Sequence, residues 1–344
     1  MREKVSGFGW SAAALALSLT SGACNSSDGG HAAPRDAGAS DASHTTSDTH
    51  DAAQHTSSDT SAGGAQASAA DGGSKASSKD AGTQDTNTRA VTIQFRAVIG
   101  DDDFACGKNY AGQGSSHVTV TPQDLRMYIA EVDLITKSGE SQRVAMDDRS
   151  PWQTSEIALL DFEDATGDCF GDEAINREIT GHVPSGDYDA VRFIVGVTDA
   201  LNHGNPETLP QPLKEPGMSW NWLLGFRFVK AELGAVSDGD DADAGAGHGA
   251  FHLGSVACSG NPSMGTVMCS KPNRNDVKLT GFDPDADAIV FDVGALFATL
   301  DLRVDSECHS AEPACEPMLR SIGVDFASGQ PVTTQSVFRV KPQK

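Results

Sequence analysis

Two histidines stand in settings where an imidazole could bind a metal ion. His203 lies in a loop rich in glycine and proline (residues 201–206), and His252 is flanked by the apolar residues Phe251 and Leu253. A half-buried imidazole between apolar neighbours needs a hydrogen-bond partner or a metal ion, and imidazole is a good ligand for copper and zinc. Neither spacing is a metal motif by itself, so two purely structural histidines are the alternative.

The segment from Trp220 to Phe228 places two tryptophans side by side. On a β-strand, positions two apart share a face, so we expect one strand with Trp220, Trp222, Phe226 and Phe228 in a single aromatic row. The simple interpretation is a core face, because large aromatic side chains pack cores well. Neighbouring indoles can also carry an oxidising hole, which makes the row a candidate redox element.

The first 24 residues have the features of a secretory signal. Arg2 and Lys4 precede a short apolar stretch, and small residues precede Cys24. This pattern predicts a cleaved signal peptide over residues 1–23 and a lipid-modified Cys24 as the first residue of the mature protein. Plain cleavage is the alternative, because Ser21 stands where lipoprotein signals usually carry leucine.

Six cysteines remain after Cys24, and an even number outside the cytoplasm indicates disulfide bonds. The short separations favour bridges between neighbours in sequence, and the remaining two cysteines would then close the N-terminal half of the domain. A cysteine-ligated metal is the alternative, but no zinc-type spacing supports it. The expected pairs are Cys258–Cys269, Cys308–Cys315 and Cys106–Cys169.

The composition changes abruptly near residue 91. Residues 25–90 contain no Val, Ile, Leu, Met, Phe, Tyr or Trp, so they have nothing to bury and cannot offset the entropy of ordering. We therefore expect a disordered tether over residues 24–90 and one folded domain over residues 91–344. In that domain, short apolar runs of strand length (residues 157–162, 188–195 and 289–293) alternate with Gly, Pro and Asp clusters, and residues 293–300 are a candidate for a turn or two of helix. This pattern is typical of an all-β fold, here a single β-sandwich with long loops.

Charge and motifs exclude several classes of function. The net charge of −23 disfavours nucleic acid and anionic membrane surfaces as partners, so we expect membrane association only through the N-terminal lipid. The chain carries no nucleophile elbow, phosphate-binding loop or dinucleotide fingerprint. The acidic run starting at Asp283 resembles a calcium loop, but Ala288 stands where glycine is required. We expect a binding protein, not an enzyme.

Several short phrases, in order, resemble the methanobactin-associated periplasmic protein family, MbnP, also described as the four-cysteine partner of a metallo-mystery pair. The tether and the acidic segment 237–249 have no counterpart in that resemblance. The phrases are residues 104–107 (FACG), 124–129 (DLRMYI), 159–163 (LLDFE), 183–188 (VPSGDY), 201–203 (LNH), 218–222 (MSWNW), 252–255 (HLGS), 272–274 (PNR) and 281–283 (GFD).

The resemblance implies a periplasmic or surface protein that binds one copper ion. Its histidines would be His203 and His252, and its Trp-x-Trp would be Trp220 and Trp222. It implies a partner as well: a MauG-like di-haem cytochrome that oxidises one of these tryptophans to kynurenine near the copper. Two alternatives stay open, namely a surface lipoprotein that binds a protein or glycan, and a copper redox enzyme.

Overall fold

The computed structural model describes residues 87–236 and 247–343. The expected signal peptide, Cys24, nearly all of the tether and most of the acidic segment 237–249 lie outside these ranges. The first strand, β1, spans Thr88–Ile99. Folded structure therefore begins three residues before the expected boundary at residue 91, because Thr88, Arg89 and Ala90 pair with strand β8 although none of them has a large apolar side chain.

One sheet is built around β1, which alternates buried and less buried residues as a strand on a core must. Its order is β19-β17-β1-β8-β6, with β2 also paired to β1, and only the β1–β17 pair is parallel. The other strands of this sheet are β2 (Asp102–Asp103), β6 (Ala145–Met146), β8 (Glu178–Pro184), β17 (Asp287–Asp292) and β19 (Phe338–Pro342).

The second sheet has nine strands in the order β16-β9-β4-β12-β13-β18, with β3, β5 and β7 also paired to β4. Only β13 and β18 run parallel to each other in it. Its strands are β3 (Tyr110–Gln113), β4 (Val118–Thr136), β5 (Ser141–Arg143), β7 (Ile157–Asp161), β9 (Tyr188–Val195), β12 (Val229–Ala235), β13 (His248–Leu253), β16 (Asn275–Thr280) and β18 (Ser306–Cys308).

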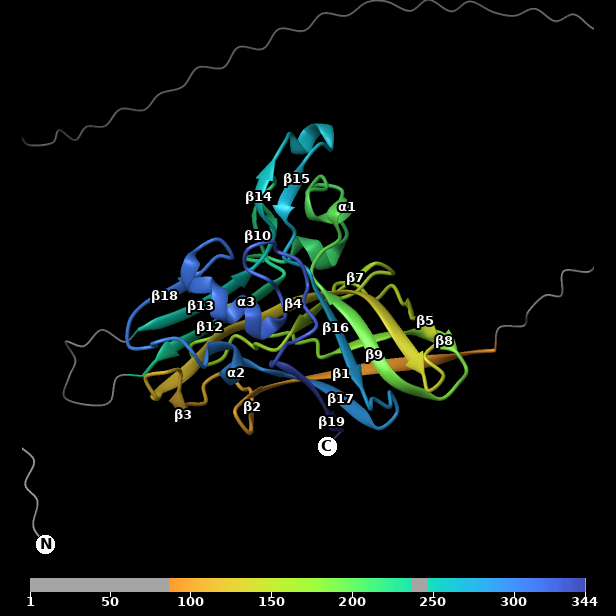
Figure 1. Cartoon of the computed structure of the whole chain (residues 1–344), viewed down its shortest axis with the longest axis horizontal. Helices are drawn as coiled ribbons and strands as arrows, with labels where there is room; N and C mark the ends of the chain where they lie inside the picture. Colours follow the sequence, from red (N-terminus) through yellow and green to blue (C-terminus); the bar gives the residue numbers. More distant parts are fainter. Residues whose placement is uncertain (1–86, 237–246, 344) are drawn as a thin grey trace, which may run out of the picture. The chain divides into compact units, whose positions relative to one another are not determined.

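The two sheets pack against each other through an aromatic and aliphatic core (Figure 1). Phe95 of β1 meets Phe193 of β9 edge to face at 5.6 Å between ring centroids, and Phe193 meets Phe338 of β19 at 5.4 Å. All three side chains are buried. The expected all-β sandwich is confirmed, and strands β7, β9 and β17 lie where the short apolar runs predicted them.

Strand β4 explains why its sequence lacks a clean two-residue period. Its 19 residues pair with strands on both sides, and its register shifts between Ala130 and Asp133. Glu131 has a φ of 51°, a conformation typical of a β-bulge. The bulge reverses the inward and outward alternation of side chains partway along the strand. In one half of β4 the core-facing residues are therefore at odd positions, and in the other half at even positions.

Two small hairpins and a few short helices complete the described ranges. One hairpin, β14–β15, extends away from the sheets beside α1 (Figure 1). The expected turn of helix near residue 293 is confirmed as α2. These elements are β10 (Ser219–Asn221), β11 (Gly225–Phe226), β14 (Val256–Ser259), β15 (Met268–Lys271), α1 (Asp199–Asn202), α2 (Val293–Phe297), α3 (Glu316–Ile322) and the 3₁₀ turns Gln211–Lys214, Pro262–Met264 and Pro313–Cys315.

Three disulfide bonds connect loops and hairpins at the edges of the sheets. They are the three pairings that the sequence spacing favours. One ties the loop before β3 to the segment after β7, one crosses the β14–β15 hairpin, and one closes the loop between β18 and α3. The bridges are Cys106–Cys169, Cys258–Cys269 and Cys308–Cys315.

None of the helices in the described ranges has the length and apolar character needed to cross a bilayer.

Candidate metal-binding sites

Two imidazoles meet at the edge of the nine-stranded sheet. Strand β13 carries His252, and the parallel strand β18 ends at Cys308, which is in register with Phe251. The next residue on each strand is a histidine, so His252 and His309 become neighbours. Their Nδ1 atoms lie 3.0 Å apart, and their ring centroids are 4.9 Å apart.

A carboxylate binds the far nitrogen of each ring. Glu232 Oε1 lies 2.7 Å from His252 Nε2, and Glu307 Oε2 lies 3.2 Å from His309 Nε2. Ionised carboxylates only accept hydrogen bonds, so each Nε2 carries the proton that it donates. In the neutral rings, both Nδ1 atoms then hold lone pairs, and these two lone pairs face each other.

Facing lone pairs at this distance repel each other unless a proton or a metal ion lies between them. With metal–nitrogen bonds of about 2.0 Å, a 3.0 Å separation of the nitrogens corresponds to an angle of about 100° at the metal. Carboxylate–histidine–metal arrangements are the usual way in which a protein fixes the tautomer of a ligand imidazole. The pair formed by His252 and His309 therefore fits a metal ion.

The electrostatics around His252 favour its neutral form. Burial lowers the pKa of His252, although the carboxylate of Glu232 opposes that change. Burial also works against the charge of Glu232, but the hydrogen bond from His252 and the ammonium of Lys230 prevail and lower its pKa to about 2. Lys230 in turn donates to Asp124 at 2.6 Å. Glu232 is thus held as an anion that orients His252 as a neutral ligand.

His203 lies in a different environment from His252. It caps the C-terminus of α1, and its Nε2 is 3.2 Å from Cys269 Sγ. Within the described ranges, the two rings share no hydrogen bond or ring contact. His252 instead contacts Glu232 through Nε2, and Glu232 is in register with Ala250. That His203 and His252 share one ion stays a prediction, and the geometry brings His252 to His309 instead.

The expected continuous strand from Trp220 to Phe228 is wrong. The segment forms a short hairpin, β10–β11, with a turn over residues 222–224, and Gly225 at its end has a φ of 78°. A side chain at Gly225 would also collide with Asn202. The turn breaks the aromatic row: Phe226 and Phe228 are in the core, whereas the two tryptophans are half-buried and contact different groups.

Trp220 packs on the residue that follows strand β13, the strand that carries His252. Its benzo ring packs so closely on Gly254 that a Cβ there would lie 2.3 Å from it. Gly254 lies two residues after His252, just past the end of β13. The guanidinium of Arg227 covers the other side of the indole at 5.1 Å. Trp222 instead donates from Nε1 to the carbonyl oxygen of His203 at 2.8 Å.

A second polar cluster surrounds Arg126 on the same sheet. Asp161 and Glu163 are fully buried, and one carboxylate oxygen of each has no hydrogen-bond partner among the described residues. Burial, together with the charge of Glu163, raises the pKa of Asp161 to about 9. Arg126 makes its own hydrogen bonds to Asp124 and Glu215. At neutral pH, Asp161 is therefore protonated.

This protonation predicts a pH-dependent stability. The folded protein holds a proton on Asp161 that the unfolded chain releases near pH 4, so stability falls as pH rises from about 4 toward 9. We expect Asp161→Asn, a neutral isostere, to remove this part of the decline, so that its stability relative to the wild type improves between about pH 5 and about pH 8. Denaturant unfolding at about pH 5 and about pH 8 measures the free energy of unfolding of both proteins. The exposed Asp168→Asn serves as control. If the free energy of unfolding fell equally with pH in Asp161→Asn and in the wild type, the protonation of Asp161 would be contradicted.

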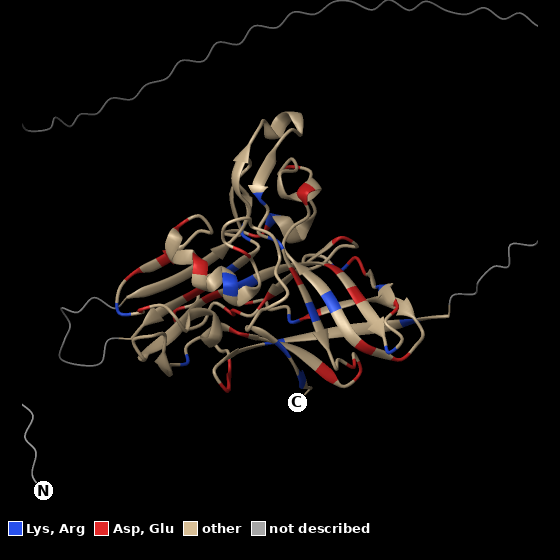
Figure 2. Ribbon diagram, in the orientation of Figure 1, with Lys and Arg blue, Asp and Glu red and all other residues tan. Residues whose placement is uncertain are grey.

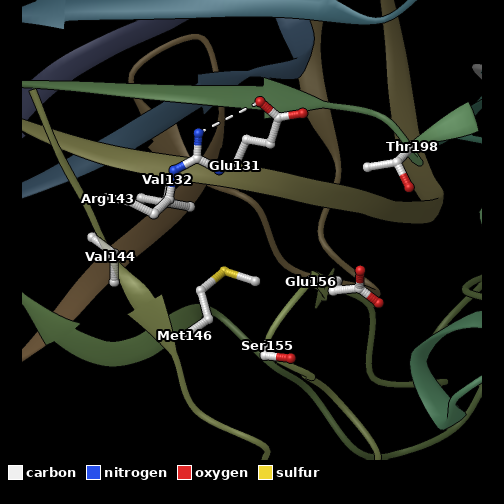
Figure 3. A pocket seen from close by; sticks show the side chains of 8 residues that line it. All are labelled: Glu131, Val132, Arg143, Val144, Met146, Ser155, Glu156 and Thr198. Carbon is white, nitrogen blue, oxygen red and sulfur yellow. Dashed lines mark ion pairs between the residues drawn. The ribbon is translucent and has the colours of Figure 1, made fainter. Parts of the chain in front are cut away.

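A hollow of 260 Å³ lies elsewhere, between β4, β5 and the loop before β7 (Figure 3). Glu131 and Arg143 line it and form an ion pair with 3.6 Å between the charged atoms. Met146 and Val144 supply its apolar wall. None of its lining residues belongs to the histidine groups, so this hollow is not part of the candidate metal site.

Sequence reasoning missed His309, Glu232 and Glu307. The only local signal was the phrase Cys308-His309, because a disulfide-closed loop fixes the residue next to it. His252 became a candidate through its apolar neighbours, but its partner His309 arises from the pairing of two strands that lie far apart in the chain.

The comparisons with known proteins agree with this fold. The sequence profile of the MbnP family matches residues 88–310. Among solved structures, MbnP from Methylosinus trichosporium is similar with a TM-score of 0.66 and 29% sequence identity, over 75% of this chain and 99% of that one. No curated protein sequence matches the chain. The matched residues include the pair His252 and His309, and the chain belongs to the MbnP family.

Proposed function

We propose that the protein binds one copper ion through His252 and His309. The observation that carries this proposal is the 3.0 Å approach of two Nδ1 atoms whose opposite nitrogens are both bound by carboxylates. Such a site presents two neutral nitrogen ligands at the edge of a rigid sheet. The role of His203 as a copper ligand remains a separate prediction.

Copper is the metal that the family membership favours. Imidazole binds copper, zinc, iron and nickel, so the two rings alone do not select the ion. The membership in the MbnP family favours copper, and Trp220 beside the site offers a further group. Conversion of Trp220 to kynurenine would replace an indole N–H, which only donates, by an aniline nitrogen and a ketone oxygen, which can accept or coordinate.

The same proposal includes a partner and a location. A MauG-like di-haem cytochrome would oxidise Trp220, with the protein as its substrate and not as an enzyme. The three disulfides favour an oxidising compartment such as the periplasm or cell surface. A lipid on Cys24 would hold the domain at the outer membrane, with residues 25–90 as the tether.

Titration tests the central claim. Purified protein, made with and without the cytochrome, is titrated with Cu(I) against a chromophoric competitor, and we expect one ion per chain at the histidine pair. Zinc is titrated in parallel to compare the two ions. Absence of stoichiometric copper binding in both preparations would overturn the proposal.

Glu232→Gln tests the role of the carboxylate behind His252. Glutamine keeps the size of the side chain, but its amide can donate a hydrogen bond to Nε2 of His252. The proton of the ring is then no longer held on Nε2. Loss of an outer-shell partner typically costs about 10–100-fold in metal affinity, and we expect a loss in this range. The exposed Glu173→Gln, which changes the net charge equally, serves as control. Equal copper affinity in both variants would rule out a role for Glu232.

A further inference from the structure

A second group of potential metal ligands lies around the disulfide of the β14–β15 hairpin. The ligand atoms of His203, Cys258 and Cys269 all lie within 4.8 Å of one another, and the three residues are only partly buried. The closest approach is 3.2 Å between His203 Nε2 and Cys269 Sγ. A nitrogen and a sulfur bound to one tetrahedral ion lie about 3.6 Å apart, so this spacing requires little movement.

The hydrogen bonds around His203 place the lone pair of the ring on Nε2, the atom that faces the sulfur, where it accepts from Asn202 until a bound ion replaces that donor. Asn202 Oδ1 accepts from the backbone N–H of Phe226 at 2.9 Å, which fixes the orientation of its amide. Asn202 Nδ2 therefore donates to His203 Nε2 at 3.0 Å. His203 Nδ1 lies 3.4 Å from the carbonyl oxygen of Trp222 and carries the proton. Nε2 is thus the unprotonated nitrogen.

The other two disulfides do not offer this combination. Each has a carboxylate, not an imidazole, as its third neighbour: Glu163 or Glu312. Each of the other two bridges has at least one buried cysteine, namely Cys169 in one and both Cys308 and Cys315 in the other, whereas both cysteines of the β14–β15 hairpin are only partly buried. The hairpin bridge is therefore the one that a reductant in solution reaches most directly.

The hairpin has an unusual composition for a protein of such high negative charge. Residues 256–270 include no charged side chain, and Figure 2 shows the hairpin uncoloured except at its base. Its two methionines, Met264 and Met268, are 72% and 77% exposed. Thioethers and thiolates are soft ligands that prefer Cu(I), so the segment offers soft sulfur without the carboxylates that attract hard cations.

We propose that reduction of the Cys258–Cys269 disulfide creates a second metal site, formed by both cysteines and His203, for a soft ion such as Cu(I). A dithiol reductant supplies the two electrons. One of its thiolates attacks a protein sulfur and breaks the S–S bond, and its second thiol resolves the mixed disulfide. The reductant leaves as a cyclic disulfide, and two protein thiols result. Binding of Cu(I) then releases the thiol protons to solvent.

This site is independent of the pair His252 and His309, because it shares no residue with that pair. It is absent while the disulfide is intact, since a disulfide sulfur is no longer a thiolate donor. Capacity for copper would then follow the redox state of the compartment, with one ion per oxidised chain and a second ion per chain reduced at the hairpin.

The test uses the full domain with His252→Ala and His309→Ala, so that only the hairpin site is measured. The protein is treated with dithiothreitol, desalted without oxygen and titrated with Cu(I) against a chromophoric competitor. Alkylation and peptide mass spectrometry identify the reduced cysteines. We expect one Cu(I) per chain after reduction and none before it, with the ultraviolet absorption of a copper–thiolate bond.

Three variants identify the side chains that hold the added ion. Cys258→Ser with Cys269→Ser should remove the ion completely, and His203→Gln should weaken its binding by about tenfold or more, as loss of a ligand does. Ser270→Ala, which alters an exposed side chain of the same hairpin, should change neither stoichiometry nor affinity. The proposal is overturned if reduction adds no copper or if the added ion survives the double serine variant. Unchanged affinity in His203→Gln would refute the role of His203.

Discussion

We expect His252→Ala or His309→Ala to lower copper affinity at least about a hundredfold, equivalent to about 2.7 kcal/mol. Removing an outer-shell partner alone costs about 10–100-fold, and each of these substitutions deletes one of two facing nitrogen ligands. Neither should unfold the domain, because both rings lie on the side of the nine-stranded sheet away from the core residues Phe251 and Leu253. Competition titration with Cu(I), together with circular dichroism, measures both effects.

His203→Ala is the informative control for these variants. In the oxidised protein it should bind copper as the wild type does, because His203 contacts Cys269 and Trp222, not the histidine pair. If His203→Ala lost copper while His309→Ala kept it, the pairing expected from the sequence, His203 with His252, would be the correct ligand set. The site proposed from the geometry would then be wrong.

We expect Trp220 to be the tryptophan that is converted to kynurenine when the protein is made together with the proposed di-haem cytochrome. Trp220 packs on Gly254, two residues from His252, under the guanidinium of Arg227. Trp222 lies against His203, and we expect it to carry the oxidising hole to Trp220. Trp220→Phe should therefore abolish both the modification and any copper binding that depends on it. Peptide mass spectrometry of protein made with and without the cytochrome measures the conversion.

The other tryptophans provide the comparison. Trp222→Phe should leave Trp220 in place but slow its oxidation, and Trp152, which packs against the core, should stay unmodified in every preparation. An intact Trp220 in the presence of active cytochrome would show that this indole is only a packing element. Modification of Trp222 alone would move the reactive position to the His203 side of the hairpin.

The sequence by itself determined the fold class, the disulfide pairs and the family. Alternation of apolar residues is a local property, so strands such as β9 were visible in the chain without any knowledge of their neighbours. The short separations of Cys258–Cys269 and Cys308–Cys315 limited their partners, because few residues lie between them. The resemblance to MbnP rested on the order of several short phrases, which an alignment of one chain with another also detects.

The tertiary structure decided the composition of the site. His309 joins His252 because β18 runs parallel to β13 in a particular register, and parallel pairing needs a long connection that leaves no local trace in the sequence. The prediction of one aromatic row was wrong for a related reason, because two-residue periodicity cannot distinguish a strand from a tight hairpin. The turn at Gly225 depends on packing against Asn202. Residue types identified the possible chemistry, but only strand register and chain reversal determined which side chains meet.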